Sequence, residues 1–88
     1  MFQVLGSRTF QKQLDELPKG FKERIIKGLK VLEDDPFAPR PKADIKPLKD
    51  TDPQKYRIRI GEYRIIYSID DKTVKVIEIF IRGRGYRE

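Results

Sequence analysis

The chain has 88 residues and a formal net charge of +6, which predicts one basic domain with a single modest core. It contains no Cys and no His, which excludes disulfides, thiolate nucleophiles, histidine acid–base catalysis and the commonest zinc ligands, so we expect neither a metal nor a cofactor. No apolar run reaches the roughly 18 residues of a membrane span and the N-terminus lacks a signal-peptide pattern, so we expect a cytoplasmic protein with no membrane partner.

The first third of the chain predicts a short strand and two helices. The strand is expected at residues 2–5, and Ser7 is a suitable N-cap for the first helix. The second helix is expected from Pro18 or Lys19 to Glu33 and follows with almost no linker, which predicts an antiparallel helical hairpin. The apolar faces consist of Phe10, Leu14 and Leu17 in the first helix and of Phe21, Ile25, Ile26, Leu29 and Leu32 in the second.

The rest of the chain predicts a proline-rich connector and three strands. Residues 36–54 hold five of the six prolines and are expected to be extended, with Ile45 and Leu48 pinned to the core. Alternating apolar residues place the strands at 55–60, 63–69 and 73–81. The order β-α-α-β-β-β predicts a single α+β domain over residues 1–88, with the helical hairpin on one face of a mainly antiparallel four-stranded sheet.

The two-residue turn Gly61-Glu62 fixes the register of the first hairpin of strands. The face toward the helices then consists of Tyr56, Ile58, Ile60, Tyr63, Ile65, Tyr67 and Ile69, with the tyrosine hydroxyls at the rim of the core. The other face, which is left open, carries Lys55, Arg57, Arg59 and Arg64. Arg59 and Arg64 lie directly opposite each other, and such a pair of like charges costs stability.

The third strand of this group is expected to follow a three-residue turn, Asp70-Asp71-Lys72. Glu78 then lies opposite Arg64 on the open face, whereas a two-residue turn would place Glu78 among the isoleucines of the core. This register places Ile77, Ile79 and Ile81 in the core and Val74, Val76, Phe80 and Arg82 on the open face.

The positive charge is concentrated toward the C-terminus, and its type changes along the chain. Residues 1–53 have 8 Lys, 3 Arg and 9 acidic residues, whereas residues 54–88 have 3 Lys, 6 Arg and 5 acidic residues. Arg is suited to two-pronged phosphate contacts, so the open face is a candidate anion site, although an exposed face of a sheet is also commonly charged only for solvation. The absence of Asn and Cys beside 39% charged residues is typical of heat-adapted proteins.

The run from Lys55 to Tyr67, an apolar strand after it, and Arg82-Gly83-Arg84 together resemble the RelE/ParE toxin superfamily. The chain is most similar to the archaeal RelE-like members, which end in a short Arg-Gly-Arg tail before an aromatic residue. The N-terminal strand, the helical hairpin and Leu48 also match, so the resemblance covers nearly the whole chain.

The resemblance implies a metal-independent mRNA endonuclease that acts in the ribosomal A site and cleaves RNA by attack of a ribose 2′-OH. The basic positions of the family carry over to Arg57, Arg64 and Arg82 as catalytic residues. We expect RNA-binding roles for Lys55, Arg59, Arg84, Tyr86 and Arg87, among which the resemblance itself covers Arg59 and Tyr86. Arg57 and Arg59 stand where some relatives have lysines, and an arginine stays protonated at any working pH.

The partners implied by the resemblance are a RelB-type antitoxin, the ribosome and its A-site mRNA. The antitoxin is expected to bring acidic residues to the open face and apolar anchors to Phe37, Ile45 and Leu48. Two alternatives stay open at the level of sequence. One is a ParE-like toxin that acts on DNA gyrase by protein contact, and the other is a nuclease-dead module that binds RNA or protein.

Overall fold

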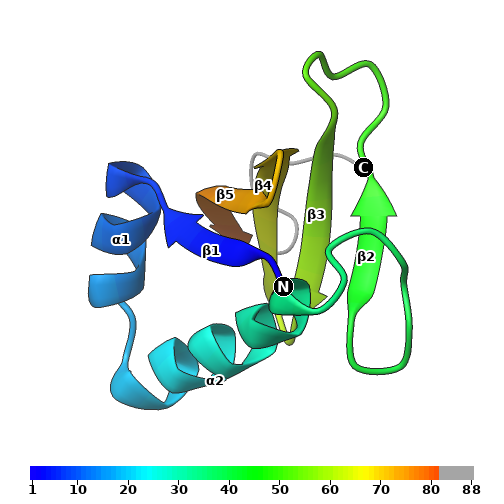
Figure 1. The fold of residues 1–88 in the computed structure, drawn as a ribbon. Helices are drawn as coiled ribbons and strands as arrows, with labels where there is room; N and C mark the ends of the chain where they lie inside the picture. The colour runs from blue at the N-terminus through cyan, green and yellow to red at the C-terminus, as the bar shows by residue number, and fades with distance from the viewer. Residues whose placement is uncertain (82–88) are drawn as a thin grey trace.

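A computed structural model describes residues 1–81, in which two helices pack against one side of a five-stranded sheet (Figure 1). The strands are β1 (Gln3–Gly6), β2 (Asp44–Pro47), β3 (Lys55–Ile60), β4 (Tyr63–Asp70) and β5 (Thr73–Ile81). The helices are α1 (Arg8–Asp15) and α2 (Lys19–Leu29), and α2 runs into a 3-10 turn, η1 (Lys30–Glu33). The sheet order β1-β5-β4-β3-β2, antiparallel except for the parallel pair β1 and β5, confirms the α+β fold with one strand more than predicted.

Helix α1 begins where the sequence predicts and protects the edge of β5 beyond the end of β1. The Ser7 hydroxyl oxygen accepts the Phe10 N–H at 3.0 Å, and the hydroxyl donates to the Ile77 carbonyl at 2.6 Å. The Gln13 amide then binds both backbone groups of Ile79, accepting its N–H at 2.7 Å and donating to its carbonyl at 3.1 Å. These side chains pair backbone groups that would otherwise form an open strand edge.

Helix α2 buries only part of its predicted apolar face. Ile25, Leu29 and Leu32 are buried, whereas Phe21 and Ile26 remain more than 40% exposed, which corrects their assignment to the core. The helix comes close to β3 at Gly28, where a Cβ atom would lie 2.6 Å from the Ile60 Cδ1 atom. The two helices lie at a steep angle to each other, so the hairpin is open (Figure 1). Within residues 1–81, neither helix has the length and apolar character that crossing a membrane requires.

Tyr67 occupies the centre of the core. Its ring is fully buried and stacks on Tyr56 with 5.6 Å between the ring centroids. Its hydroxyl donates to the Pro36 carbonyl at 2.7 Å, so the prediction of a hydroxyl at the rim of the core is wrong for this residue. Burial, followed by the nearby Tyr56 ring, raises the pKa of the Tyr67 hydroxyl well above its ordinary value of 10.

The raised pKa of Tyr67 makes the folded protein sensitive to alkaline pH. The folded state holds this proton to a higher pH than the unfolded chain does, so above about pH 10 the free energy of unfolding falls as pH rises, by up to about 1.4 kcal/mol per pH unit. Tyr67→Phe is expected to lose about 1–3 kcal/mol at pH 7, because the Pro36 carbonyl loses its donor, and to show a shallower decline above pH 10. Urea unfolding at pH 7 to 11 measures both effects. A decline as steep in Tyr67→Phe as in the wild type would contradict the assignment.

The register between β4 and β5 differs from the prediction. The turn has two residues, because Asp70 pairs with Thr73, and Asp71 in this turn adopts a positive φ of 55°. A β-bulge follows, so that Ile66 lies opposite Glu78 while Tyr67 lies opposite Val76. The bulge moves Glu78 back to the open face after Val74 and Val76 have entered the core. The predicted pairing of Glu78 with Arg64 is therefore wrong, and Arg64 lies opposite Phe80.

The proline-rich connector contains the additional strand, β2. It pairs with β3 at the edge of the sheet, where Pro47 is tolerated as its last residue. Ile45 is buried, as predicted, and Leu48 is half-buried. Before this strand, the Asp35 carboxylate accepts the backbone N–H groups of Phe37 and Ala38, which lower its pKa.

Candidate functional site

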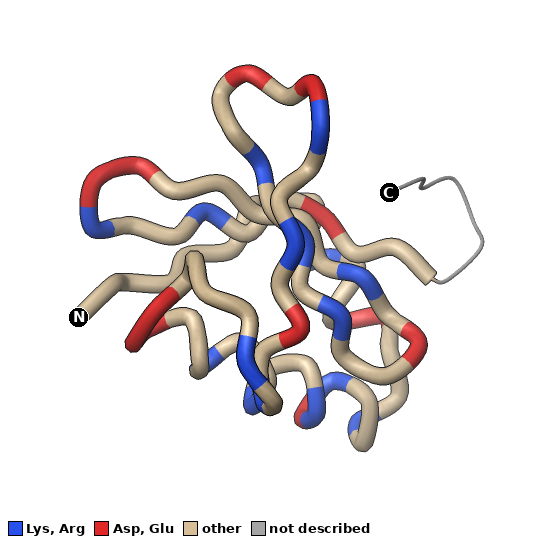
Figure 2. The backbone as a smooth tube through the Cα atoms, turned by 90° about the vertical axis from the view of Figure 1, so that its right-hand side faces the viewer, with Lys and Arg blue, Asp and Glu red and all other residues tan. Residues whose placement is uncertain are grey.

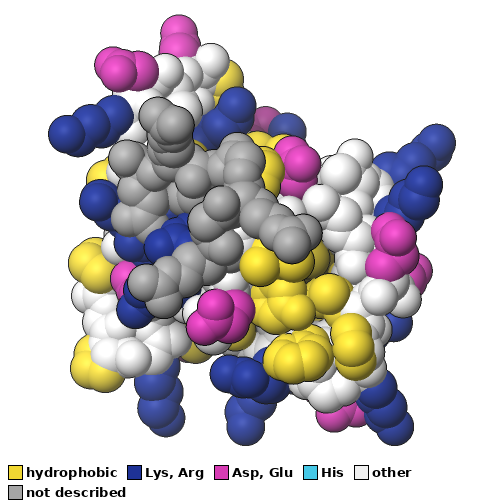
Figure 3. Space-filling view, turned by 180° about the vertical axis from the view of Figure 1, so that it is seen from behind, with side chains coloured by type: hydrophobic (Ala, Val, Ile, Leu, Met, Phe, Trp, Pro, Cys, Tyr) yellow, Lys and Arg dark blue, Asp and Glu magenta, His cyan; other side chains and the backbone are white. Residues whose placement is uncertain are grey.

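The open face of the sheet gathers basic side chains from three neighbouring strands. Their positions on β2, β3 and β4 are fixed by the register of these strands, which confirms that Arg59 lies opposite Arg64. Figure 2 marks the Lys and Arg positions in blue along the backbone. We define the basic face as Lys46, Lys55, Arg57, Arg59 and Arg64. Figure 3 shows the molecule from behind, with dark blue Lys and Arg side chains and a few magenta Asp and Glu side chains on its surface.

Two arginines of the basic face share one carboxylate, that of Asp44 on β2. The Arg57 Nη1 atom donates to the Asp44 Oδ1 atom at 3.0 Å and to the Asp44 carbonyl oxygen at 2.8 Å. The Arg59 Nε atom lies 3.1 Å from the Asp44 Oδ2 atom. The Arg57 side chain is only 8% exposed, whereas that of Arg59 is 47% exposed. Arg57 therefore lies beneath the surface and Arg59 lies at it.

Sequence reasoning missed Asp44 and Lys46, because it treated residues 36–54 as a connector without a strand. A signal was present in the alternation of Asp44, Ile45, Lys46 and Pro47, which is typical of an edge strand. In place of the predicted pairing of Glu78 with Arg64, the structure pairs Asp44 with two of the arginines.

The other predicted site residues fall into two groups. Lys55 lies on β3 opposite Ser68, and Arg64 is half-buried on β4, so both belong to the basic face. The remaining four residues, Arg82, Arg84, Tyr86 and Arg87, lie outside the described residues.

The arrangement suits the binding of an anion with charge spread over several oxygen atoms. Guanidinium groups present planar pairs of donors that match phosphate oxygens, and the basic face brings three such groups together. Fixed positive groups of this kind stabilise negative charge that develops in a transition state. None of these groups accepts a proton at neutral pH, so their contribution to catalysis is electrostatic.

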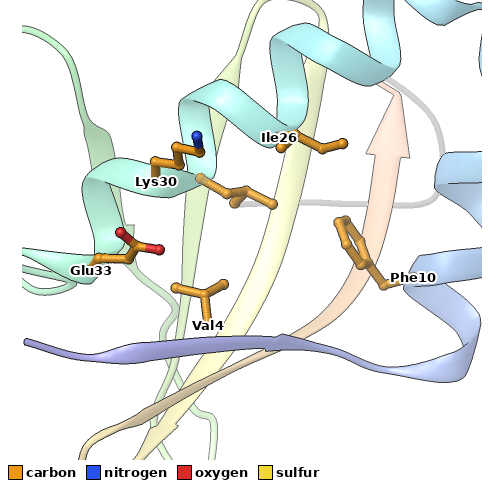
Figure 4. A pocket seen from close by; sticks show the side chains of 6 residues that line it. Val4, Phe10, Ile26, Lys30 and Glu33 are labelled. Carbon is orange, nitrogen blue, oxygen red and sulfur yellow. The ribbon is translucent and has the colours of Figure 1, made fainter.

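A separate apolar pocket of about 200 Å³ lies on the helical side of the sheet, between β1, α1 and α2 (Figure 4). It is lined by Val4, Phe10, Ile26, Leu29, Lys30 and Glu33. The pocket shares no residue with the basic face. Of the three predicted apolar anchors for a partner, Phe37 is 49% exposed and Leu48 is half-buried, whereas Ile45 is buried in the core and is not accessible.

Comparison with known proteins identifies the family. The profile of a family described as "ParE toxin of type II toxin-antitoxin system, parDE" matches residues 4–86. The RelE1 protein of Methanocaldococcus jannaschii is 33% identical over 88 residues, which cover 98% of this chain and 96% of that protein.

Solved structures agree with these matches. A chain of the archaeal RelE-RelB complex from Pyrococcus horikoshii OT3 superposes with a TM-score of 0.80 and 36% identity, covering 96% of this chain and 98% of that chain. The isolated E. coli RelE toxin shares the fold with a TM-score of 0.74 and 22% identity, covering 97% of this chain and 88% of that chain. The chain therefore belongs to the ParE/RelE family of toxins of type II toxin–antitoxin systems.

Proposed function

We propose that this toxin is an endonuclease that inhibits translation by cleaving mRNA in the ribosomal A site. The observation that carries the proposal is the presence of Arg57, Arg59 and Arg64 on one face of the sheet, held by paired strands. An RNA strand offers a phosphate at every nucleotide for such groups to bind, whereas a toxin that acts on a protein target meets no such series of phosphates. The relatives named RelE support the same reading.

The reaction starts with attack of a ribose 2′-OH on the adjacent phosphate. The 2′-oxygen loses its proton to water and bonds to phosphorus, negative charge builds on the phosphorane oxygens, and the bond from phosphorus to the 5′-oxygen breaks as that oxygen takes a proton from water. Arg59 and Arg64 contact the phosphate from the surface, while Arg57 adds positive charge from beneath it, where weaker solvent screening strengthens its effect. Arg82 is assigned to the leaving oxygen by the family resemblance alone.

Proton transfer is the weak part of this site, since the chain has no His and arginines remain protonated. The ribosome compensates by holding the 2′-OH in line with the phosphate, an orientation that can contribute about 7 kcal/mol or more. Cleavage of free RNA is therefore slow. Within residues 1–81, the carboxylate that contacts Arg57 and Arg59 is that of Asp44, and this part of the chain contains no cluster of three side chains suited to hold a metal ion.

The test is a translation extract with and without the purified toxin, followed by mapping of mRNA ends in stalled ribosomes. The expected products carry a 2′,3′-cyclic phosphate and a 5′-hydroxyl, because the nucleophile is the neighbouring 2′-OH and not a metal-bound water. Analysis of the end groups separates the toxin's chemistry from the Mg²⁺ that the ribosome itself requires. Products with a 5′-phosphate, or intact mRNA together with blocked DNA supercoiling by gyrase, would contradict the proposal.

We also propose that a RelB-type antitoxin neutralises the toxin, as the complexes of its relatives suggest. The net charge of +6 and the basic face call for an acidic segment, and the exposed Phe37 ring offers an apolar anchor. The association rate of the neighbouring gene's product is expected to fall steeply as salt is raised, and further in Arg59→Glu with Arg64→Glu. Rates measured across a salt series decide this. If neither salt nor the two substitutions change the association rate, the antitoxin binds a surface other than the basic face.

A further inference from the structure

Asp44 lies between Arg57 and Arg59, two of the three arginines of the basic face that the proposed function uses. It lies on the edge strand β2 directly opposite Arg59, and Arg57 lies two residues away on the same face of β3. Its two carboxylate oxygens are divided between the two arginines, one for each, at 3.0 and 3.1 Å. Its backbone carbonyl also accepts from Arg57. One residue thus fixes two guanidinium groups through three contacts.

These contacts differ from an ordinary surface ion pair, which contributes little to stability. The Arg57 side chain is 8% exposed, and a guanidinium at such a depth requires an opposite charge and hydrogen-bond acceptors nearby. The contact to Arg59 is made through its Nε atom. Within residues 1–81, the structure gives the terminal nitrogens of Arg59 no hydrogen-bond acceptor, and these two atoms form the fork that matches a pair of phosphate oxygens.

We infer that Asp44 is a positioning residue of the toxin: it holds Arg57 and Arg59 in the arrangement that receives the phosphate of the RNA. The inference rests on the proposed function. Without this carboxylate, Arg59 faces Arg64 and lacks the counter-charge that Asp44 supplies, so the guanidinium groups of Arg57 and Arg59 are held less firmly. A displacement of about 1 Å in groups that stabilise a transition state slows a reaction by roughly a hundredfold.

The inference leads to a result opposite to that expected from charge alone. Asp44→Asn raises the net charge from +6 to +7, which by itself strengthens attraction to RNA. If Asp44 merely masks positive charge, the variant cleaves as fast as the wild type or faster. If Asp44 positions the arginines, the single-turnover rate on saturating ribosome-bound mRNA falls by about tenfold or more, while ribosome affinity is unchanged or higher.

The matched control is Asp70→Asn, at the far end of β4. This carboxylate lies on the same face, bonds Lys75 at 3.2 Å with its side chain 74% exposed, and makes no contact with the arginines, so its removal changes the net charge equally. It is expected to leave the cleavage rate within about twofold of the wild type. Asp44→Glu keeps the carboxylate and is expected to recover a part of the rate that Asp44→Asn loses. Thermal unfolding of each variant identifies any loss that comes from the fold itself.

A second readout separates this inference from the proposed function. In NMR spectra, the Nε–H proton of Arg59 is expected to exchange with water at least tenfold faster in Asp44→Asn than in the wild type, because the Asp44 carboxylate lies 3.1 Å from the nitrogen that carries it. If the wild type leaves ribosome-bound mRNA intact, the proposed function fails, and the exchange rates alone decide whether Asp44 holds Arg59. Equal exchange in both proteins, or a cleavage rate undiminished in Asp44→Asn, would overturn the inference.

Discussion

Replacing Arg64 with alanine is expected to slow cleavage of ribosome-bound mRNA about a hundredfold or more while the fold remains intact. The removed guanidinium is one of three on the basic face, and a single fixed group that stabilises transition-state charge contributes about 3 kcal/mol. The stability should change by less than about 1 kcal/mol, because the substitution also removes the repulsion between Arg64 and Arg59, which lie directly opposite each other.

Two further variants show whether position or charge matters. Arg64→Lys keeps the positive charge but loses the planar pair of donors, so we expect a rate between those of the wild type and Arg64→Ala. Lys27→Ala removes a charge from the exposed side of α2, far along the chain from the basic face, and should cleave at the wild-type rate. Single-turnover cleavage of mRNA in stalled ribosomes measures all three. Equal losses in Arg64→Ala and Lys27→Ala would show that only the total charge of the toxin matters.

The hairpin of β3 and β4 was predictable from the sequence because two local signals agree. The Gly61-Glu62 turn allows one register, with Gly61 at a positive φ of 61°, and the alternation of residues on both sides assigns every side chain to a face. The start of α1 was predictable for a similar reason, since the Ser7 cap and the helical spacing of apolar residues point to the same boundary.

The β-bulge in β5 left one signal in the sequence that the prediction did not use: Lys75 and Glu78 are three residues apart, and strict alternation cannot place both on the same face. Val74, Val76, Ile77 and Ile79 suit either face, so the acidic side chain of Glu78 was the main guide to the register. It led to a longer turn, whereas the chain keeps the short turn and inserts Ile77 as the extra residue. Lys75 distinguishes these two solutions, because the longer turn would place its charged side chain on the core face, whereas the short turn leaves it exposed on the open face.

The candidate site was predictable as a set of arginines but not as an arrangement. Their common face follows from the register of β3 and β4, whereas the burial of Arg57 and its pairing with Asp44 depend on β2. That strand is four residues long and ends in Pro47, and strand propensity is weak over so short a segment. Asp44 and Arg57 are 13 residues apart in the sequence, so no local sequence pattern predicts the contact between them.

Ile65 follows Arg64 directly in β4 and points to the opposite side of the sheet, which allows stability and activity to be separated on one strand. Its side chain is fully buried, opposite Ile58 on β3 and Ile79 on β5. Ile65→Ala is expected to lower the free energy of unfolding by about 3 kcal/mol, since it removes three methyl or methylene carbons and leaves a cavity in a close-packed core. A domain of this size has only about 5–10 kcal/mol in total.

The measurement is urea unfolding at 25 °C together with thermal unfolding, in which Ile65→Ala should lower the midpoint by roughly 12–20 °C. Ile65→Val is the matched control, because it removes a single carbon and should cost about 1 kcal/mol. At a temperature where it is still folded, Ile65→Ala should cleave ribosome-bound mRNA near the wild-type rate, whereas Arg64→Ala should be stable and inactive. If Ile65→Ala kept the unfolding midpoint of the wild type but lost cleavage, Ile65 would contribute to the activity of Arg64 without contributing to stability. The two faces of β4 would then not have separate roles in stability and cleavage.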